Sequence, residues 1–342
     1  MQDTIYRCDP HSFHGRVEMR PLESECLRDN ALGDPHVREV PVYLPPGAEA
    51  GDQRYPVIYL LAGLTGRGQS MLETHPWKRG VVSRMDSAMA AGEVPPAILV
   101  MPDCFTKLGG SQYVNSSAVG LYEDHVVEEL VPFVDQHYPT LSGRRAVCGK
   151  SSGGFGALHL GMRHPDLFPI VASISGDCCF EYTFGGEFLA CLRGLTKFEG
   201  DPARFLESFY EEPNLSGDGH SILNVLAMAA CYSPNPESPL GFDLPIDLHT
   251  GERIDEIWQR WLAFDPVVAC ESHADALRSL EWLYVECGIK DEFHLQWGAR
   301  VLARKLEALK ISFDHAEHDG GHFGIDSRYV ELIPKLAERL MR

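Results

Sequence analysis

Short runs of apolar residues alternate with longer amphipathic stretches along most of this chain. The apolar runs are rich in branched and aromatic side chains and end at Gly, Pro or Asp, which is typical of strands buried on both faces of a sheet. They occupy residues 38–44, 57–61, 97–101, 145–148, 170–174, 282–285 and 311–313. Because helical patterns separate them, the sequence predicts an α/β fold with a mostly parallel central sheet flanked by helices.

The stretches between the runs place their apolar residues on one helical face. One such face carries Val127, Leu130, Val131 and Val134. Faces of this kind indicate helices that pack on a sheet, so we assign them to the core. Pro132 lies inside this stretch, and we expect a kink or a shifted helix start there.

Residues 178–276 interrupt the alternation. The segment is rich in Gly and Pro, has helical patterns at 203–210, 222–231 and 254–263, and has little strand character. It falls between two predicted strands, where an insertion would hang over the edge of the sheet that carries the site. We therefore expect one domain over residues 1–342, with a cap or lid insertion that shapes a substrate pocket. The alternative is that the insertion only covers apolar surface or mediates self-association.

A serine in a G-x-S-x-G pattern is the strongest chemical signal. Gly149, Ser151 and Gly153 form the pattern, after the run at 145–148 and before a helix-compatible run at 155–162. A serine hydroxyl becomes a useful nucleophile when a sharp turn projects it into a cleft beside a base and backbone N–H donors. The bare pattern also fits a Gly-rich connection between a strand and a helix, but the strand-turn-helix context favours a catalytic serine.

A carboxylate and a histidine follow two later strands. Asp291 comes after the predicted strand at 281–287, and His322 comes after the predicted strand at 311–317. The ends of parallel strands meet at one edge of a sheet, where open α/β sheets build their sites. The chain order Ser151, Asp291, His322 is the order of the α/β-hydrolases.

Other interpretations of these residues stay open. Asp291 could cap the helix that follows it, and Glu292 is a weaker candidate for the acid. His322 could be a solvated loop residue. His318 and His322 have a spacing compatible with metal ligands, but no third ligand is placed to complete the set, so we expect no metal.

Composition and charge restrict the classes of partner that the protein is expected to bind. The 342 residues are 44% hydrophobic and 23% charged, with a formal net charge of −19. This charge argues against nucleic acid and against an anionic membrane surface as partners, because both would be repelled. No apolar run approaches the roughly 20 residues needed to span a bilayer.

The cysteines and the amino terminus bear on location. Residues 1–7 lack the basic and apolar segments of a secretory signal, so we expect a cytoplasmic protein. The ten cysteines are then expected to be reduced thiols.

Several separate motifs in the expected order give the chain a family resemblance. They are the segment 55–66, Met101-Pro102-Asp103, residues 122–124 and 128–130, the segment 149–154, residues 164–168, and Gly321-His322. With these motifs the chain resembles the esterase family of α/β-hydrolases. That family includes the S-formylglutathione hydrolases, feruloyl and acetyl-xylan esterases, enterochelin esterases and mycobacterial mycolyltransferases. The resemblance extends from about residue 23 to residue 336 and is weak across the insertion.

The resemblance implies a role for each site residue. Ser151 would be the nucleophile, His322 the base and Asp291 the acid. The backbone N–H groups of Ser152 and Leu64 would form the oxyanion hole. No metal or organic cofactor is implied.

The chain departs from the family pattern at two positions. Ala62-Gly63 stands where many relatives have His-Gly, which puts in doubt any contact made by that imidazole. Lys150 stands where histidine is more frequent, either near the site entrance or, as we prefer, in solvent.

Four further residues are candidates for substrate binding. Tyr113 and Asn115 lie in a Gly-rich loop that follows the strand at 97–101, and the alternative for them is an ordinary structured loop. Phe180 and Tyr182 follow another strand end and are candidate pocket walls.

The function that these observations predict is serine carboxylic-ester hydrolysis of short-chain or small acyl esters through an acyl-enzyme. S-formylglutathione hydrolysis and acyl transfer are alternatives within the family. An alternative of another class is a non-catalytic binding protein on a hydrolase scaffold. The expected partner is a small-molecule ester, and the sequence leaves a homodimer open.

Overall fold

The computed structural model describes residues 13–48, 52–72, 74–75 and 78–342. The amino-terminal residues on which the expectation about a secretory signal rests lie outside this part of the chain. Within the described residues, no helix combines the length and the apolar character needed to cross a membrane.

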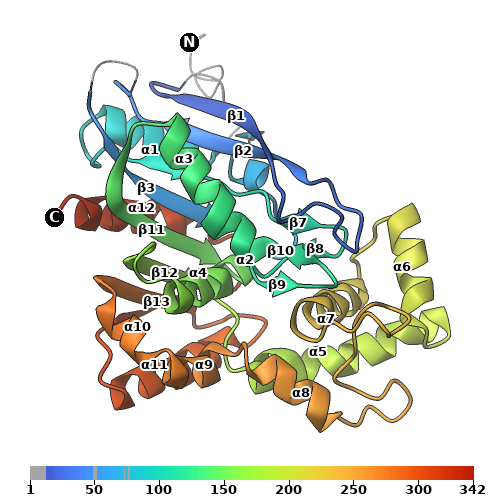
Figure 1. The fold of residues 1–342 in the computed structure, drawn as a ribbon. Coiled ribbons are helices and arrows are strands. Elements are labelled where there is room, and N and C mark those ends of the chain that lie inside the picture. The colour runs from blue at the N-terminus through green and yellow to red at the C-terminus, as the bar shows by residue number, and fades with distance from the viewer. Residues whose placement is uncertain (1–12, 49–51, 73, 76–77) are drawn as a thin grey trace, which may run out of the picture.

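An eight-stranded sheet forms the centre of the molecule (Figure 1), in the order β1-β2-β6-β3-β11-β12-β13-β14. The strands are β1 (Arg16–Glu23), β2 (Val37–Leu44), β3 (Tyr55–Leu61), β6 (Ile98–Val100), β11 (Thr140–Lys150), β12 (Ile170–Ile174), β13 (Trp282–Gly288) and β14 (Asp314–His318). Neighbours from β6 to β14 run parallel. The pairs β1/β2 and β2/β6 run antiparallel. The prediction of a mostly parallel sheet flanked by helices is therefore confirmed.

Two strands differ from the sequence prediction. The last strand begins at Asp314, after the apolar run at 311–313. Strand β1 was not predicted, because charged residues alternate with apolar ones along its length and only Leu22 is buried. Its place at the edge of the sheet explains this pattern, since an edge strand pairs on one side and needs little apolar surface.

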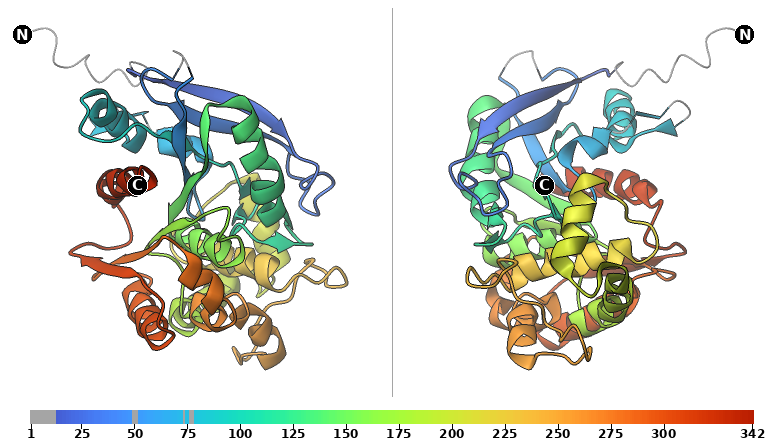
Figure 2. Two further views of the ribbon diagram at one scale, coloured as in Figure 1. Left: turned by 60° about the vertical axis from the view of Figure 1, so that its left-hand side comes forward. Right: turned by 90° about the vertical axis from the view of Figure 1, so that its right-hand side faces the viewer.

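Helices cover both faces of the sheet (Figure 2). They include α1 (Val81–Ala90) and α12 (Asp326–Leu340) on one face, and α3 (Val131–His137), α4 (Ser152–Arg163) and α11 (Leu295–Ala308) on the other. Strand β3 contributes side chains to the cores on both faces of the sheet. Ile58 and Leu60 join the core beneath α1 and α12, whereas Val57, Tyr59 and Leu61 join the other core. Successive side chains of a strand point to opposite faces, so continuous apolar runs suit this double burial.

The expected irregularity at Pro132 is confirmed. Residues Tyr122–Asp124 form the short helix α2, His125–Leu130 form a π-helical segment, and α3 follows with Pro132 in its first turn. Proline is tolerated there because the first N–H groups of a helix have no intrahelical acceptor.

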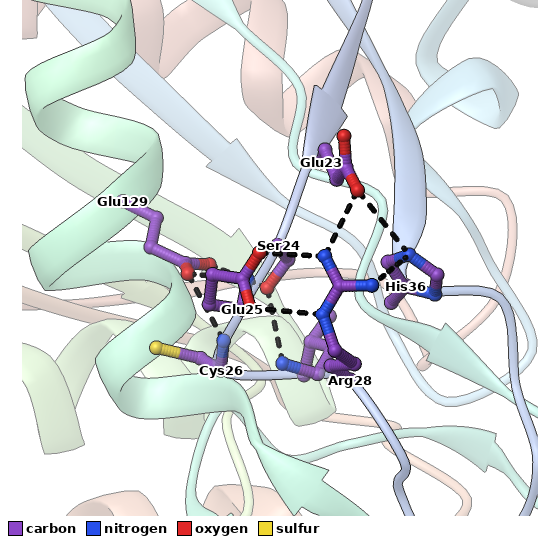
Figure 3. A network of polar contacts seen from close by, with 8 residues as sticks. Glu23, Ser24, Glu25, Cys26, Arg28, His36 and Glu129 are labelled. Atoms are coloured by element: carbon purple, nitrogen blue, oxygen red, sulfur yellow. Dashed lines mark hydrogen bonds and ion pairs between the residues drawn. The ribbon is translucent and has the colours of Figure 1, made fainter.

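A polar network joins this π-helical segment to the chain between β1 and β2 (Figure 3). The Glu129 carboxylate accepts hydrogen bonds from the Ser24 hydroxyl and from the backbone N–H groups of Glu25, at 2.7 Å, and Cys26, at 3.0 Å. Burial opposes the charge, but the hydrogen bonds from His125 and Ser24 outweigh it and lower the pKa of Glu129 to about 2. Ser24 is fully buried and donates directly to the carboxylate, so this Ser-His-Glu set holds the fold and offers no nucleophile.

Between β12 and β13 the chain is helical. The helices are α5 (Phe180–Leu195), α6 (Pro202–Glu211), α7 (Gly219–Tyr232), α8 (Asp255–Leu262), α9 (Pro266–Ser272) and α10 (Ala274–Ser279). Helix α5 continues through Gly185 and Gly186, in a stretch where the sequence analysis identified no helical pattern. Its buried face, with Phe184 and Phe188, packs near α7, while both glycines are exposed on the other side. Tertiary packing thus overrides the low helix propensity of glycine.

Four of these helices form two groups. Helices α9 and α10 pack against α4 and α11 and belong to the layer that covers the sheet. Helices α5 and α7 pack against each other, on the side of the molecule away from α1 and α12 (Figure 1). That residues 178–276 act as a cap or lid stays a prediction.

Short two-stranded sheets lie outside the central sheet in the described part of the chain. They are β4 (Thr74–His75) with β5 (Lys78–Arg79), β7 (Phe105–Thr106) with β8 (Gly109–Gly110), and β9 (Asn115–Ser116) with β10 (Gly120–Leu121).

Candidate active site

Ser151 lies at the sharp turn between β11 and α4. Its backbone has φ 58° and ψ −127°, a conformation that L-residues rarely adopt and that is held by the surrounding structure. The Ser151 N–H donates to Ile174 O at 3.0 Å, and Ser151 O accepts from the Phe155 N–H at 2.9 Å. The turn is therefore fixed on both sides, by the neighbouring strand and by the first turn of the helix.

The two glycines of the pattern are required by contact distances. A Cβ at Gly149 would lie 2.4 Å from the carbonyl carbon of Gly153, and a Cβ at Gly153 would lie 2.2 Å from Leu61 O. Neither position has room for a side chain, because the helix starts directly against the strands.

His322 connects the serine to a carboxylate. Its Nε2 lies 3.0 Å from Ser151 Oγ, and its Nδ1 lies 2.8 Å from Asp291 Oδ2. A carboxylate only accepts, so Nδ1 carries the proton and Nε2 is free to accept from the hydroxyl. Asp291 and His322 are buried, which shields the hydrogen bond between them from water. The structure thus brings together the three residues that the sequence singled out.

The surrounding loop holds this arrangement. Asp291 Oδ1 accepts from the Phe293 N–H at 3.0 Å. Helix α11 begins at Leu295 after His294, so Asp291 is not its cap. Glu292 Oε2 accepts from the backbone N–H of His322 at 2.6 Å, and Glu292 therefore positions the histidine loop instead of replacing the acid. This role was missed, because sequence spacing cannot show a bond between two loops.

Ser152 and Leu64 line the same pocket as Ser151. Ser152 is the first residue of α4, where helix N–H groups have no intrahelical partner and the helix dipole is positive. Leu64 lies in the loop after β3. That loop is supported from behind: Leu64 O accepts from the Gly110 N–H at 2.7 Å, and Ala62 O accepts from the Tyr113 hydroxyl at 2.9 Å.

Comparison with known proteins identifies the family. A family model described as "Putative esterase" matches residues 34–324. The chain belongs to this esterase family. It is accordingly a carboxylic ester hydrolase of the serine hydrolase class with the α/β-hydrolase fold.

Solved structures share the fold of this esterase. A ferulic acid esterase has 22% sequence identity and a TM-score of 0.61, over 96% of this chain and 100% of that one. An S-formylglutathione hydrolase from Agrobacterium tumefaciens has 18% identity and a TM-score of 0.59, over 96% and 97%. A ferulic acid esterase from the anaerobic fungus Anaeromyces mucronatus has 14% identity and a TM-score of 0.53, over 100% and 97%.

A pocket of about 220 Å³ opens beside Ser151. Its walls combine the loop after β3, Ser151, His322 and residues of helices α5 and α7. They comprise Gly63, Leu64, Thr65, Gly66, Lys150, Ser151, Ser152, Asp177, Thr183, His220, Asn224, Phe293, His322 and Phe323. Aromatic rings flank the histidine: the centroid of Phe293 lies 4.8 Å and that of Phe323 5.4 Å from the His322 ring.

Tyr113 and Asn115 do not line this pocket, contrary to the prediction. Tyr113 is buried beneath the loop after β3, where its hydroxyl donates a hydrogen bond to Ala62 O. Asn115 and Asp124 form reciprocal hydrogen bonds of 2.7 and 3.1 Å that tie β9 to α2. The Gly-rich loop thus supports the site from behind, as the structured-loop alternative held.

Phe180 and Tyr182 are also outside the pocket. Phe180 is fully buried, with its ring centroid 4.9 Å from Phe184 and 5.3 Å from Tyr232. Tyr182 is 51% exposed. The prediction rested on their place after a strand end, whereas both lie on α5 and neither side chain lines the pocket.

Lys150 lines the pocket, and its Nζ lies 5.7 Å from the centroid of the Phe323 ring. The preference for a solvated lysine was therefore wrong. A lysine over an aromatic face is stabilised by a cation–π interaction.

Sequence reasoning missed four polar residues of the pocket. Asp177 comes directly after Ser175-Gly176 at the end of β12, so the strand-end argument that found Asp291 applied to it as well. Thr183, His220 and Asn224 lie on helices whose orientation no local pattern reveals.

Proposed function

We propose that this esterase hydrolyses small acyl esters by two-step acyl transfer through Ser151. The observation that supports this proposal is the chain of hydrogen bonds from Ser151 through His322 to Asp291, at 3.0 and 2.8 Å. Distances of this kind allow a base to take a proton from the hydroxyl as it attacks.

In the first step, Ser151 Oγ attacks the ester carbonyl carbon while His322 Nε2 takes the hydroxyl proton. Asp291 keeps the imidazole in the tautomer with the proton on Nδ1 and stabilises the imidazolium that forms. The imidazolium then gives its proton to the leaving alcohol, and the acyl group stays on Ser151.

The negative charge of the tetrahedral intermediate needs donors that are already in place. In this proposal the N–H groups of Ser152 and Leu64 are these donors. Each such donor stabilises the transition state by roughly 3 to 4 kcal/mol. The hydrogen bond from the Gly66 N–H to Gly63 O, at 3.0 Å, supports this role, because Gly63 O belongs to the same peptide plane as the Leu64 N–H.

In the second step, water attacks the acyl-enzyme and His322 again acts as the base. Hydrolysis regenerates the Ser151 hydroxyl and releases the acid. The pocket volume of about 220 Å³ supports a small acyl or alcohol portion over a long chain.

Substitution of the serine tests the proposal. We expect Ser151→Ala to reduce kcat for 4-nitrophenyl acetate and butyrate by at least about 10⁴-fold, with an unchanged circular dichroism spectrum. Ser272→Ala is a matched control, because Ser272 is exposed on α9 and bonds only its own helix and the adjacent His273. Wild-type activity in Ser151→Ala would refute the proposal, and it would favour a non-catalytic role for this site.

A further inference from the structure

The pocket beside Ser151 is aromatic on one side and polar on the other. Phe293 and Phe323 flank the histidine, whereas Asp177, Thr183 and Asn224 lie on the side of α5 and α7. Apolar walls suit an alkyl or aryl group, and polar walls must be matched by polar groups of the ligand or remain hydrated. The polar side therefore indicates which polar groups a substrate would place there.

Asp177 is the charged residue of that side. It is buried, and its Oδ2 accepts a hydrogen bond from a neutral amide, Gln112 Nε2, at 3.2 Å. Among the described residues, no arginine or lysine forms an ion pair with it. An ionised carboxylate accepts about four hydrogen bonds, so most of its capacity is left for a ligand in the pocket.

Asp265 is a second buried carboxylate, and its hydrogen bonds differ from those of Asp177. Asp265 accepts from the backbone N–H groups of Cys179 at 2.9 Å, Phe180 at 2.7 Å and Val267 at 3.0 Å. Its acceptor capacity is used within the fold, between α5 and α9. Asp177 has the same chemistry and similar burial, but it faces the pocket.

Residues on α5 and α7 add to the hydrogen-bond acceptor character of this side of the pocket. Asn224 on α7 donates to Glu187 on α5 at 3.3 Å, so a second carboxylate lies behind the polar wall. Burial lowers the pKa of His220, which keeps its imidazole neutral at physiological pH. This wall is therefore negative, and the favourable ligand groups are hydrogen-bond donors.

From this geometry we infer that Asp177 determines substrate specificity by accepting a hydrogen bond from a hydroxyl or ammonium group close to the ester. The inference rests on the proposed function, because it places that group in the pocket of Ser151. Esters with such a donor are then better substrates than alkyl esters of the same shape.

Isosteric esters test this inference. On the acyl side they are 4-nitrophenyl butyrate, 3-hydroxypropionate and 3-aminopropionate. On the alcohol side they are propyl, 2-hydroxyethyl and 2-aminoethyl acetate. We expect kcat/KM of the wild type to favour a donor ester over its alkyl isostere by about tenfold or more on one side, as a hydrogen bond to a charged group does. Comparison of the hydroxyl with the amino ester shows which donor the site takes.

Variants assign the preference to the carboxylate. Asp177→Leu should abolish the preference, and the isosteric Asp177→Asn should reduce it, more for the ammonium than for the hydroxyl ester. Asp265→Asn is the matched control, because it removes a buried carboxylate outside the pocket, and its preference should equal that of the wild type.

A fluorophosphonate probe separates the two proposals. Labelling of Ser151 in the wild type and in both Asp177 variants shows that the nucleophile is intact, so a change of preference is a change of specificity. A wild type that shows less than a twofold preference on both sides, or Asp177 variants that keep the full preference, would overturn the inference. Absence of labelling in the wild type would instead refute the proposed function.

Discussion

The sheet edge around Ser151 and the helices above it are built in different ways. At the sheet edge, backbone hydrogen bonds and close contacts fix each group: Ser151 is held by Ile174 O, and Leu64 O by the Gly110 N–H. In α5 and α7, side chains face the pocket from helices that are held by packing. We therefore expect the chemistry to depend on backbone geometry, and the choice of substrate to depend on side chains that can change without disturbing that geometry.

The largest effect is expected at the acid of the sheet edge. Asp291→Asn can donate to His322 Nδ1 and thereby favour the wrong tautomer, so kcat should fall by about 10⁴-fold with little change in KM. Steady-state kinetics with 4-nitrophenyl acetate measures this loss. Asp275→Asn is the control, since that side chain is fully exposed on α10. A loss below about tenfold would show that Asp291 does not orient the histidine.

One substitution made in both regions sharpens the comparison. Gly149→Ala places a Cβ 2.4 Å from the Gly153 backbone, so we expect a loss of at least about 2 kcal/mol in the free energy of unfolding and a large loss of activity. Gly185→Ala, in the middle of α5, meets no atom within 4 Å. It should raise the free energy of unfolding by about 0.5 to 1 kcal/mol and leave kcat unchanged.

Urea unfolding and ester hydrolysis of the two variants provide the measurement. Equal effects at the two glycines would mean that the elbow and the helix tolerate side chains alike. That result would remove the distinction between a region fixed by its backbone and a region open to substitution.

The same distinction explains what the sequence could predict. Ser151, Asp291 and His322 were found because each follows a strand, and parallel strands bring their ends together. Tyr113 and Phe180 were assigned to substrate from their neighbourhood in sequence, but the direction of a side chain depends on packing between distant segments. Helix α5 was not predicted, because its glycines have low helix propensity and its apolar face is stabilised by packing against α7, which the local sequence does not show. Cytoplasmic location, partners and oligomeric state stay predictions.

A smaller effect is expected from Asp177, the pocket carboxylate between β12 and α5. Burial raises the pKa of Asp177 to about 6, above the value near 3.9 of an unfolded chain. The folded state thus binds the proton more tightly than the unfolded state does. The ionised group therefore lowers the free energy of unfolding, and this effect reaches its full size above about pH 6. The free energy of unfolding of Asp177→Asn should exceed that of the wild type by about 1 to 3 kcal/mol at pH 7.5.

This gain should shrink as the pH falls from 6 towards 4, where the native carboxyl becomes protonated. Thermal or urea unfolding across that range checks the sign. A gain that is constant with pH would mean that Asp177 is not buried as a charge.

The smallest effect concerns the support of the loop after β3, which carries Leu64. Tyr113→Phe removes the hydrogen bond to Ala62 O, which we expect to reduce stability by about 1 kcal/mol and kcat by up to about tenfold. KM should stay the same, because Tyr113 lies behind the loop and outside the pocket. Tyr182→Phe, on an exposed side chain, is the control. A rise in KM alone would return Tyr113 to the substrate-binding residues.

The central claim is that His322 activates Ser151, and site-specific labelling tests it most directly. After reaction with a fluorophosphonate, peptide mass spectrometry should locate a single adduct on Ser151. The labelling rate should fall by at least about 10³-fold in His322→Ala. An adduct on another residue, or an equal rate in His322→Ala, would contradict the account.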